Sequence, residues 1–393
     1  MAGGLDALID RYRPLQCRDS GSPLFQAGPN DILQLELIAD FAHINTDTYS
    51  ETGGDWGILS YQGKEGQRRF LPVFIKDRGN SRRDFCEWVP LRILFGSPLL
   101  KEKLEKQAME HLPLRKQLAK MYRLLKRETG EKRPAKGVPQ KDNLFRKLGD
   151  DIKLVTHCGK SSWRHVGGET REIQEERLLQ EYYLYRLLEQ MGSVIPKTRL
   201  AEVTYRDPQG KPLVTRKAFF REPRSRLAKR CGLSKHPSPG VEEKGIDETS
   251  WFQLELYNEF IYFRDYGRDG RNINLLYRDD GWVVTGPYDF DLSGIIVPEY
   301  RPNGRTVQEN RKDYFEPWIA FHDGDERAVV QIHFMVKNRE KMRQILEHSL
   351  LGEEKRAHML EWFDSYMTVL EQFLERNRQL MPALTKRVGS LAR

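Results

Sequence analysis

Three side chains, Asp265, Asn272 and Asp289, have the types and spacing that metal-assisted phosphate chemistry needs. Asp289 lies in the stretch GPYDFDLSG, where Asp291 follows two residues later among aromatic and apolar neighbours. Burying an ionised carboxylate is costly unless a cation or several hydrogen-bond donors pair it. Mg²⁺ and Mn²⁺ accept carboxylate and amide oxygens, usually together with water and phosphate oxygens. Two such acids would also be expected in a solvated turn, so the neighbouring elements must distinguish a metal site from a turn.

The segment around these side chains predicts a helix, a loop and a β-hairpin. The helix SWFQLELYNEFIYFRD leads into the loop, and the strands INLLY and WVVTG follow, joined by the turn RDDG. If Arg278 pairs with Gly281 across that turn, Asn272 faces Pro287 at the open end of the hairpin. A turn of another length shifts this register by a residue or two. The hairpin therefore predicts that all three side chains converge.

The chemistry that these residues predict is transfer of the γ-phosphoryl group of ATP. In protein kinases, one Asp accepts the proton of the substrate hydroxyl, while an Asn and a second Asp hold the metal. We assign Asp265 as the catalytic base, and Asn272 and Asp289 as metal ligands. Asp291 is either a further metal ligand or the residue that orients Asp289.

The N-terminal half supplies candidate groups for binding the nucleotide. Lys153, in the strand DIKLVTHC, and Glu181, in the next helix, are predicted to form an ion pair that positions a phosphate-contacting lysine. Glu175 and Glu176 are alternatives to Glu181. A lysine in a strand is usually solvated, so the order of the elements carries this prediction. A predicted tight turn offers a guanidinium and backbone N–H groups to phosphates; it consists of Arg78, Gly79, Asn80 and Ser81.

The order of the elements is compatible with a bilobal phosphotransferase. We therefore expect an α+β, atypical protein-kinase-like bilobal fold, with a small antiparallel-sheet lobe that carries one helix and a mostly helical C-terminal lobe. The expected segments are a tail at 1–30, a small lobe at 31–222 with a basic insertion at 101–148, a linker at 223–249, and a helical lobe at 250–393 that contains the catalytic hairpin 265–294.

Several of these segments carry a family resemblance. RGNSRRDFCEWVPLRILF, KLVTHC, QEYYLYRLL, the Asp265 and Asn272 pair, and PYDFDLSG resemble the spore-coat protein H (CotH) kinase family, and more closely a branch of CotH-like bacterial proteins. The resemblance covers roughly residues 31–300, interrupted by the basic insertion. It implies a kinase-like fold, ATP with Mg²⁺ or Mn²⁺, and phosphorylation of protein hydroxyls. Asp265 then matches the family's catalytic Asp, Asp289 its metal-binding Asp, and Arg78 begins its R-G-N-S turn.

The chain also departs from the family pattern. The family pattern has a basic residue soon after the turn, but the segment DFCEWVPLRILF contains only Arg92. The assignment of Lys153 as the nucleotide-contacting lysine therefore depends on the order of the elements and not on a motif match. Two alternatives stay open: a degenerate kinase-like protein that binds without turnover, and another metal-dependent phosphate enzyme, such as a nucleotidyltransferase or phosphohydrolase. Cys86 and Cys158 fall inside two of the resembling motifs, which favours a disulfide between them if the protein is exported.

The composition of the chain bears on which binding partners and which cellular compartments can be expected. The chain has 393 residues and a net charge of +8, and the segment 101–147 holds fifteen Lys/Arg against six Asp/Glu. This segment is predicted to be a solvated basic face or an electrostatic site for an acidic protein, a nucleic acid or a membrane surface. Nothing in it reads nucleic-acid bases, so a nucleic-acid partner is not expected. No transmembrane segment or signal peptide is visible, so cytoplasmic and exported locations both stay open. The four cysteines are either free thiols or two disulfides.

Overall fold

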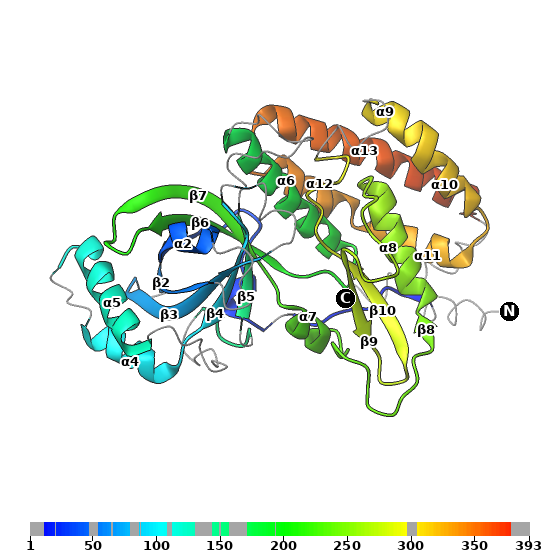
Figure 1. Ribbon diagram of the computed structural model, residues 1–393. Helices are drawn as coiled ribbons and strands as arrows, with labels where there is room; N and C mark the ends of the chain where they lie inside the picture. The colour runs from blue at the N-terminus through cyan, green and yellow to red at the C-terminus, as the bar shows by residue number, and fades with distance from the viewer. Residues whose placement is uncertain are drawn as a thin grey trace. The chain divides into compact units, whose positions relative to one another are not determined.

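The structure is a computed structural model that divides into two compact units. The barrel unit consists of Ser20–Tyr182 and Lys197–Arg226, and the hairpin unit consists of Met1–Asp19, Tyr183–Pro196 and Leu227–Arg393 (Figure 1). The described residues are 12–19, 21–46, 54–63, 66–78, 86, 88–107, 112–129, 144–148, 151–156, 171–192, 194–296 and 305–378.

The barrel unit is built on a closed sheet of seven strands in the order β1-β2-β3-β4-β5-β7-β6. Neighbouring strands are antiparallel except β1 and β6, whose parallel pairing closes the barrel. The strands are β1 (Leu33–Ile38), β2 (Asp55–Gln62), β3 (Arg68–Asp77), β4 (Leu91–Phe95), β5 (Asp151–Thr156), β6 (Thr198–Arg206) and β7 (Pro212–Arg221).

The closed barrel contradicts the predicted kinase-like bilobal fold with its small antiparallel sheet. Most of the strands were predicted, but β2 was missed because nearly every residue in it is buried, so it lacks a strand's usual alternation of apolar and polar residues. The parallel contact between β1 and β6, which places Leu35 opposite Val203, leaves no local signal in the sequence. Closure is stabilising because it pairs both edges of every strand, whereas an open sheet leaves two edges unpaired.

The basic insertion packs on the barrel as two helices, α4 (Pro98–Gln107) and α5 (Leu114–Thr129). Leu118, Met121 and Leu125 form the apolar stripe of α5 and are fully buried in a cluster that includes Trp56 of β2 and Phe74 of β3. The described helices of the insertion are therefore part of the packed structure of this unit, and the exposed basic residues Arg115, Lys116 and Arg123 lie on the remaining face of α5.

The helices α2 (Phe41–Thr46) and α6 (Arg171–Gln190) complete the main helical elements of the barrel unit. The boundary between the units passes through α6, between Tyr182 and Tyr183, and a second boundary lies within α7 (Arg224–Arg230). The predicted linker at 223–249 thus contains a helix, and it also contains the short strand β8 (Gly245–Ile246).

The hairpin unit combines a three-stranded sheet with a group of helices. The sheet has the order β8-β10-β9, and α8 packs beside β10 (Figure 1). Aromatic side chains of α8 and α13 meet in the core, where Phe260 lies edge-on to both Phe363 and Tyr366. The elements are α8 (Glu248–Phe260), β9 (Ile273–Tyr277), β10 (Trp282–Pro287), α9 (Val307–Asn310), the π-helix η4 (Arg311–Phe315), α10 (Glu316–Phe321), α11 (Glu326–Lys337), α12 (Arg339–Glu347) and α13 (Glu353–Arg376). Among the described helices, none has the length and apolarity needed to cross a membrane.

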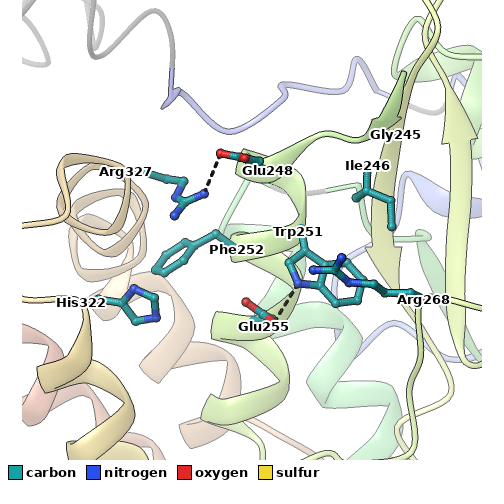
Figure 2. Close-up of a pocket in the computed structure, with 9 residues that line it drawn as sticks. All are labelled: Gly245, Ile246, Glu248, Trp251, Phe252, Glu255, Arg268, His322 and Arg327. Carbon is teal, nitrogen blue, oxygen red and sulfur yellow. Dashed lines mark hydrogen bonds and ion pairs between the residues drawn. The ribbon is translucent and has the colours of Figure 1, made fainter. Parts of the chain in front are cut away.

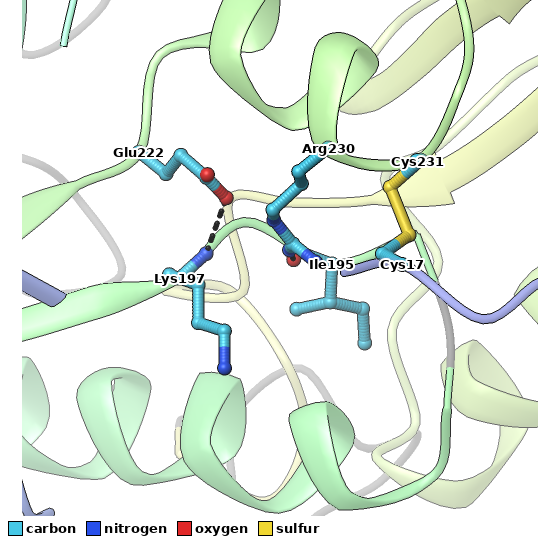
Figure 3. The surroundings of a disulfide bond; sticks show 6 residues. All are labelled: Cys17, Ile195, Lys197, Glu222, Arg230 and Cys231. Carbon is cyan, nitrogen blue, oxygen red and sulfur yellow. Dashed lines mark hydrogen bonds between the residues drawn. A yellow bond between two sulfur atoms is a disulfide. The ribbon is translucent and has the colours of Figure 1, made fainter. Parts of the chain in front are cut away.

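A disulfide between Cys17 and Cys231 joins the start of the chain to the end of α7 within the hairpin unit (Figure 3). The N–H of Arg18 donates a hydrogen bond to the carbonyl of Arg230 at 2.9 Å, and the buried Arg230 guanidinium donates to the carbonyl of Ile195. The segment predicted as a tail is therefore held in place over residues 12–19.

This bridge decides between the two alternatives for the cysteines. The described cysteines are all disulfide-bonded, so four free thiols is the wrong alternative. Cys86 is disulfide-bonded, and Cys158, its expected partner, lies outside the described residues.

Candidate active site

Asp265 lies on a loop that begins directly after α8. Helix α8 is capped at its N-terminus by Asp247, whose side chain accepts the N–H of Ser250 at 2.8 Å. The loop is closed on itself, because the N–H of Gly267 donates to the carbonyl of Arg271 at 3.2 Å and the N–H of Gly270 donates to Gly267 at 3.0 Å. These bonds fix the loop that carries Asp265.

Asp265 and Asn272 are in direct contact. The amide nitrogen Nδ2 of Asn272 donates to the backbone carbonyl of Asp265 at 2.7 Å and to its carboxylate Oδ2 at 3.0 Å. The guanidinium of Arg271 lies 3.5 Å from the other carboxylate oxygen. The side chain of Asp265 remains 42% exposed, so a substrate hydroxyl can reach it. The structure thus brings the expected base and one expected metal ligand together.

The hairpin that follows differs from the predicted register by one residue. Pro287 pairs with Ile273, whereas the prediction paired it with Asn272. The difference arises at the turn, where the N–H of Arg278 donates to the carbonyl of Trp282 at 2.9 Å. At the open end, the carbonyl of Asn272 consequently accepts the N–H of Tyr288 at 3.2 Å. Asn272 still lies at the end of the hairpin from which the Asp289 loop leaves.

Asp289 is held by its backbone and by the next residue. Its N–H donates to the hydroxyl of Tyr185 in α6 at 2.8 Å. Phe290 is fully buried, with its ring centroid 4.7 Å from that of Tyr185 and 6.1 Å from that of Phe263. Asp289 and Asp291, on either side of Phe290, are half-buried. The apolar neighbours that the sequence places around the acids therefore anchor the loop and leave both carboxylates partly accessible.

Both expected metal ligands have an uncommon backbone conformation. The φ angle is +50° at Asn272 and +70° at Asp289, in the left-handed region that few residues other than glycine adopt. Asn and Asp tolerate this region best, and such strain is frequent at functional sites. A further tie joins the two loops, because the N–H of Gly294 donates to the carbonyl of Tyr262 at 2.9 Å. Asp265, Asn272 and the Asp289 loop thus form one bonded assembly, which we call the hairpin site.

The hairpin site offers few protein oxygens to a metal. No group of three or more His, Cys, Asp or Glu that could hold a metal occurs among the described residues. Mg²⁺ usually takes one or two carboxylates and completes its shell with water and substrate phosphates. Asn272 donates through Nδ2, which leaves its amide oxygen for a cation. A metal held by Asp289 and Asn272 would therefore need further oxygen ligands from water or phosphate.

The predicted nucleotide-binding residues belong to the barrel unit. Lys153 lies in β5, where it pairs in register with Arg92 of β4 and Arg221 of β7, and Glu181 is buried in α6. Glu175, one of the alternatives to Glu181, forms an ion pair with Lys217 at 2.8 Å. An ion pair between Lys153 and Glu181 stays a prediction.

The predicted phosphate-binding turn is described only at its start. The N–H of Arg78 donates to the carbonyl of Pro90 at 2.8 Å, which continues the pairing of β3 with β4. Gly79, Asn80 and Ser81 lie outside the described residues. Their contact with phosphate, and that of Arg78, stays a prediction.

Two features of the hairpin unit were not predicted. One is Tyr185, which holds Asp289; its only sequence signal was membership of the aromatic run YYLY. The other is a pocket of about 550 Å³ along one face of α8 (Figure 2). Its signal was the spacing of Glu248, Trp251, Phe252 and Glu255 at intervals of three and four residues. The lining residues are Gly245, Ile246, Glu248, Trp251, Phe252, Glu255, Arg268, His322 and Arg327.

Comparison with known proteins adds no relative to this description. The sequence matches no protein-family model and no curated protein.

Proposed function

We propose that this protein is a metal-dependent phosphotransferase that moves the γ-phosphoryl group of ATP to a hydroxyl of a protein or a small molecule. The observation that carries the proposal is the pair of hydrogen bonds from Asn272 to Asp265, formed at the end of the hairpin from which Asp289 leaves. A base for the hydroxyl and oxygen ligands for a metal are the groups that phosphoryl transfer requires.

In the proposed reaction, the carboxylate of Asp265 accepts the proton of the attacking hydroxyl. Asn272 orients that carboxylate through the hydrogen bond to Oδ2. Asp289 and the amide oxygen of Asn272 hold Mg²⁺ or Mn²⁺, and Asp291 is a further ligand or orients Asp289. The bound metal would offset the negative charge of the phosphates.

Lys153, Glu181 and the turn from Arg78 to Ser81 stay the proposed nucleotide-binding residues. Membership of the CotH family is also a proposal. Because the chain does not adopt the fold that this family implies, the activity is argued from the hairpin site and not from the resemblance.

The experiment that tests the proposed function measures the transfer of label from ATP to an acceptor. The full chain is incubated with Mg²⁺ or Mn²⁺ and with ATP labelled at either the γ or the α position. Label that reaches the protein or an added acceptor from the γ position supports the proposal. Transfer from the α position would identify a nucleotidyltransferase instead. Nucleotide binding without transfer from either position would identify a binding protein without turnover.

Tyr185→Phe tests the support of Asp289. The substitution keeps the ring that packs on Phe290 and removes the hydroxyl that accepts the N–H of Asp289. We expect the rate of phosphoryl transfer to fall about tenfold, and the free energy of unfolding to fall by about 1 kcal/mol.

Tyr183→Phe is the matched control. Tyr183 lies in the same helix as Tyr185, and its hydroxyl accepts the N–H of Leu350 at 2.8 Å. It should lose similar stability and keep its rate. Equal rates in the two variants, measured by label transfer, would contradict a role for Tyr185 at the hairpin site.

The basic insertion is the proposed docking site for an acidic protein substrate. Deleting it would uncover the apolar cluster beneath α5, so charge reversal at exposed positions is the sharper test. Arg115, Lys116 and Arg123 are exposed on α5. Changing all three to Glu should lower the rate of phosphorylation of an acidic acceptor protein such as casein severalfold. The rate with a small hydroxyl acceptor should not change, and an equal loss with both acceptors would contradict docking.

A further inference from the structure

The pocket on α8 is separate from the hairpin site but lies next to it along the chain. Its floor is the face of α8 that carries Trp251 and Glu255, and other walls come from β8, from the end of α10 and from α11. Arg268 lies over the ring of Trp251 (Figure 2), and it belongs to the loop that also carries Asp265. A volume of about 550 Å³ lies within the range of about 300–1,000 Å³ that small-molecule pockets occupy.

The charges of the pocket balance. Two carboxylates, Glu248 and Glu255, face two guanidinium groups, Arg268 and Arg327. Arg327 is engaged, because it lies 3.4 Å from Glu248 and 3.1 Å from Asp325. An anionic ligand would be repelled by the carboxylates and a cationic one by the arginines. A neutral ligand therefore fits this pocket best.

Glu255 and Arg268 remain available for a ligand. The indole N–H of Trp251 donates to Oε1 of Glu255 at 2.7 Å, which leaves Oε2 open. Burial raises the pKa of Glu255, while the hydrogen bond from Trp251 and the nearby His322 and Arg268 lower it. Arg268 has no carboxylate within ion-pair distance in the described part of the chain, and its guanidinium lies 4.8 Å from the centre of the Trp251 ring.

These two groups select for hydroxyls. A carboxylate can only accept hydrogen bonds, whereas a guanidinium can only donate them. A hydroxyl does both, so one or two neighbouring hydroxyls satisfy Glu255 and Arg268 together. The aromatic side chains Trp251, Phe252 and His322 supply apolar contact area for the C–H groups of the same ligand. A ring that carries several hydroxyls offers both the hydrogen-bonding groups and the apolar C–H surface that these lining residues can contact.

We propose that this pocket binds a neutral saccharide, with Glu255 accepting and Arg268 donating hydrogen bonds to its hydroxyls. Binding of the saccharide does not rest on the proposed function.

Binding is measured by titration calorimetry on the full chain without nucleotide or metal. The probes are glucose, xylose and maltose, with glucose 6-phosphate and glucosamine as charged analogues. We expect a millimolar dissociation constant for at least one neutral sugar and weaker binding of both charged analogues. Glu255→Gln and Arg268→Ala should each weaken binding about tenfold, at unchanged melting temperature. Arg278→Ala, on the exposed turn of the hairpin, should leave the dissociation constant unchanged.

Each outcome supports or contradicts either the saccharide pocket or the proposed function. No heat change with any of the three sugars, binding that both pocket variants retain, or tighter binding of a charged analogue overturns the saccharide pocket. Sugar binding that the pocket variants weaken supports it, whether or not phosphoryl transfer is found. A protein that binds the sugar and transfers no label would contradict the proposed function alone. A protein that transfers label to casein and binds no sugar would contradict the pocket alone.

Discussion

Replacing Asp265 by Asn is expected to lower the rate of γ-phosphoryl transfer by about 10²–10⁴-fold, the contribution of a positioned general base. Asn has nearly the same shape but cannot accept the proton of the attacking hydroxyl. The hydrogen bond from Asn272 to the backbone carbonyl of residue 265, 2.7 Å long, does not depend on the carboxylate. The loop should therefore keep its geometry, and the melting temperature should not change.

Asp269→Asn is the matched control for this experiment. Asp269 lies on the same loop, is exposed, and accepts the N–H of Arg271 at 3.1 Å. Its replacement should leave kcat within about twofold of the unmodified protein, since it is not assigned to the reaction. If Asp265→Asn kept the kcat of this control, Asp265 would not be the base.

Removing the disulfide between Cys17 and Cys231 is expected to lower the free energy of unfolding of the hairpin unit by about 5 kcal/mol. The two cysteines are 214 residues apart, and a cross-link stabilises mainly by restricting the unfolded chain, more strongly for longer loops. The bridge also holds residues 12–19, where the carbonyl of Tyr12 accepts a hydrogen bond from Gln331 of α11.

The measurement compares urea unfolding of the oxidised protein with that of the double variant Cys17→Ser and Cys231→Ser, followed by tryptophan fluorescence. Ser225→Ala, at an exposed position of α7, is the control and should change stability by less than about 0.5 kcal/mol. A loss of less than about 1 kcal/mol in the double variant would mean that the bridge contributes little to the folded state. Mass spectrometry of peptides from the unreduced protein checks independently that the bridge forms.

The parts of the structure that the sequence predicted are governed by short-range signals. Helix α8, the turn at Arg278 and the strands β9 and β10 have local apolar patterns and turn residues. The contact between Asp265 and Asn272 follows from them, because only a short closed loop separates the two residues. Even the error in register was local: the N–H of Arg278 donates to the carbonyl of Trp282, one residue beyond the predicted partner Gly281, whose own N–H donates to the carbonyl of Arg278.

The features that the sequence did not predict depend on long-range contacts. Barrel closure needs β1 to pair with β6, and β2 is too uniformly buried to show a strand pattern. The pairing of Cys17 with Cys231 cannot be deduced from four cysteines, which allow three connectivities. The pocket was missed because its lining residues lie far apart in the sequence: α8 contributes four of them, while Arg268, His322 and Arg327 come from three other elements.

The most direct test of the hairpin site is the rate of γ-phosphoryl transfer as a function of Mg²⁺ concentration in three proteins: the unmodified chain, Asp289→Asn and Asp280→Asn. Asp280 lies on the exposed turn at the opposite end of the same hairpin and serves as the control. We predict that Asp289→Asn requires at least tenfold more Mg²⁺ for half-maximal rate, or shows no transfer, while Asp280→Asn behaves like the unmodified chain. The same Mg²⁺ dependence and rate in all three proteins would contradict the account.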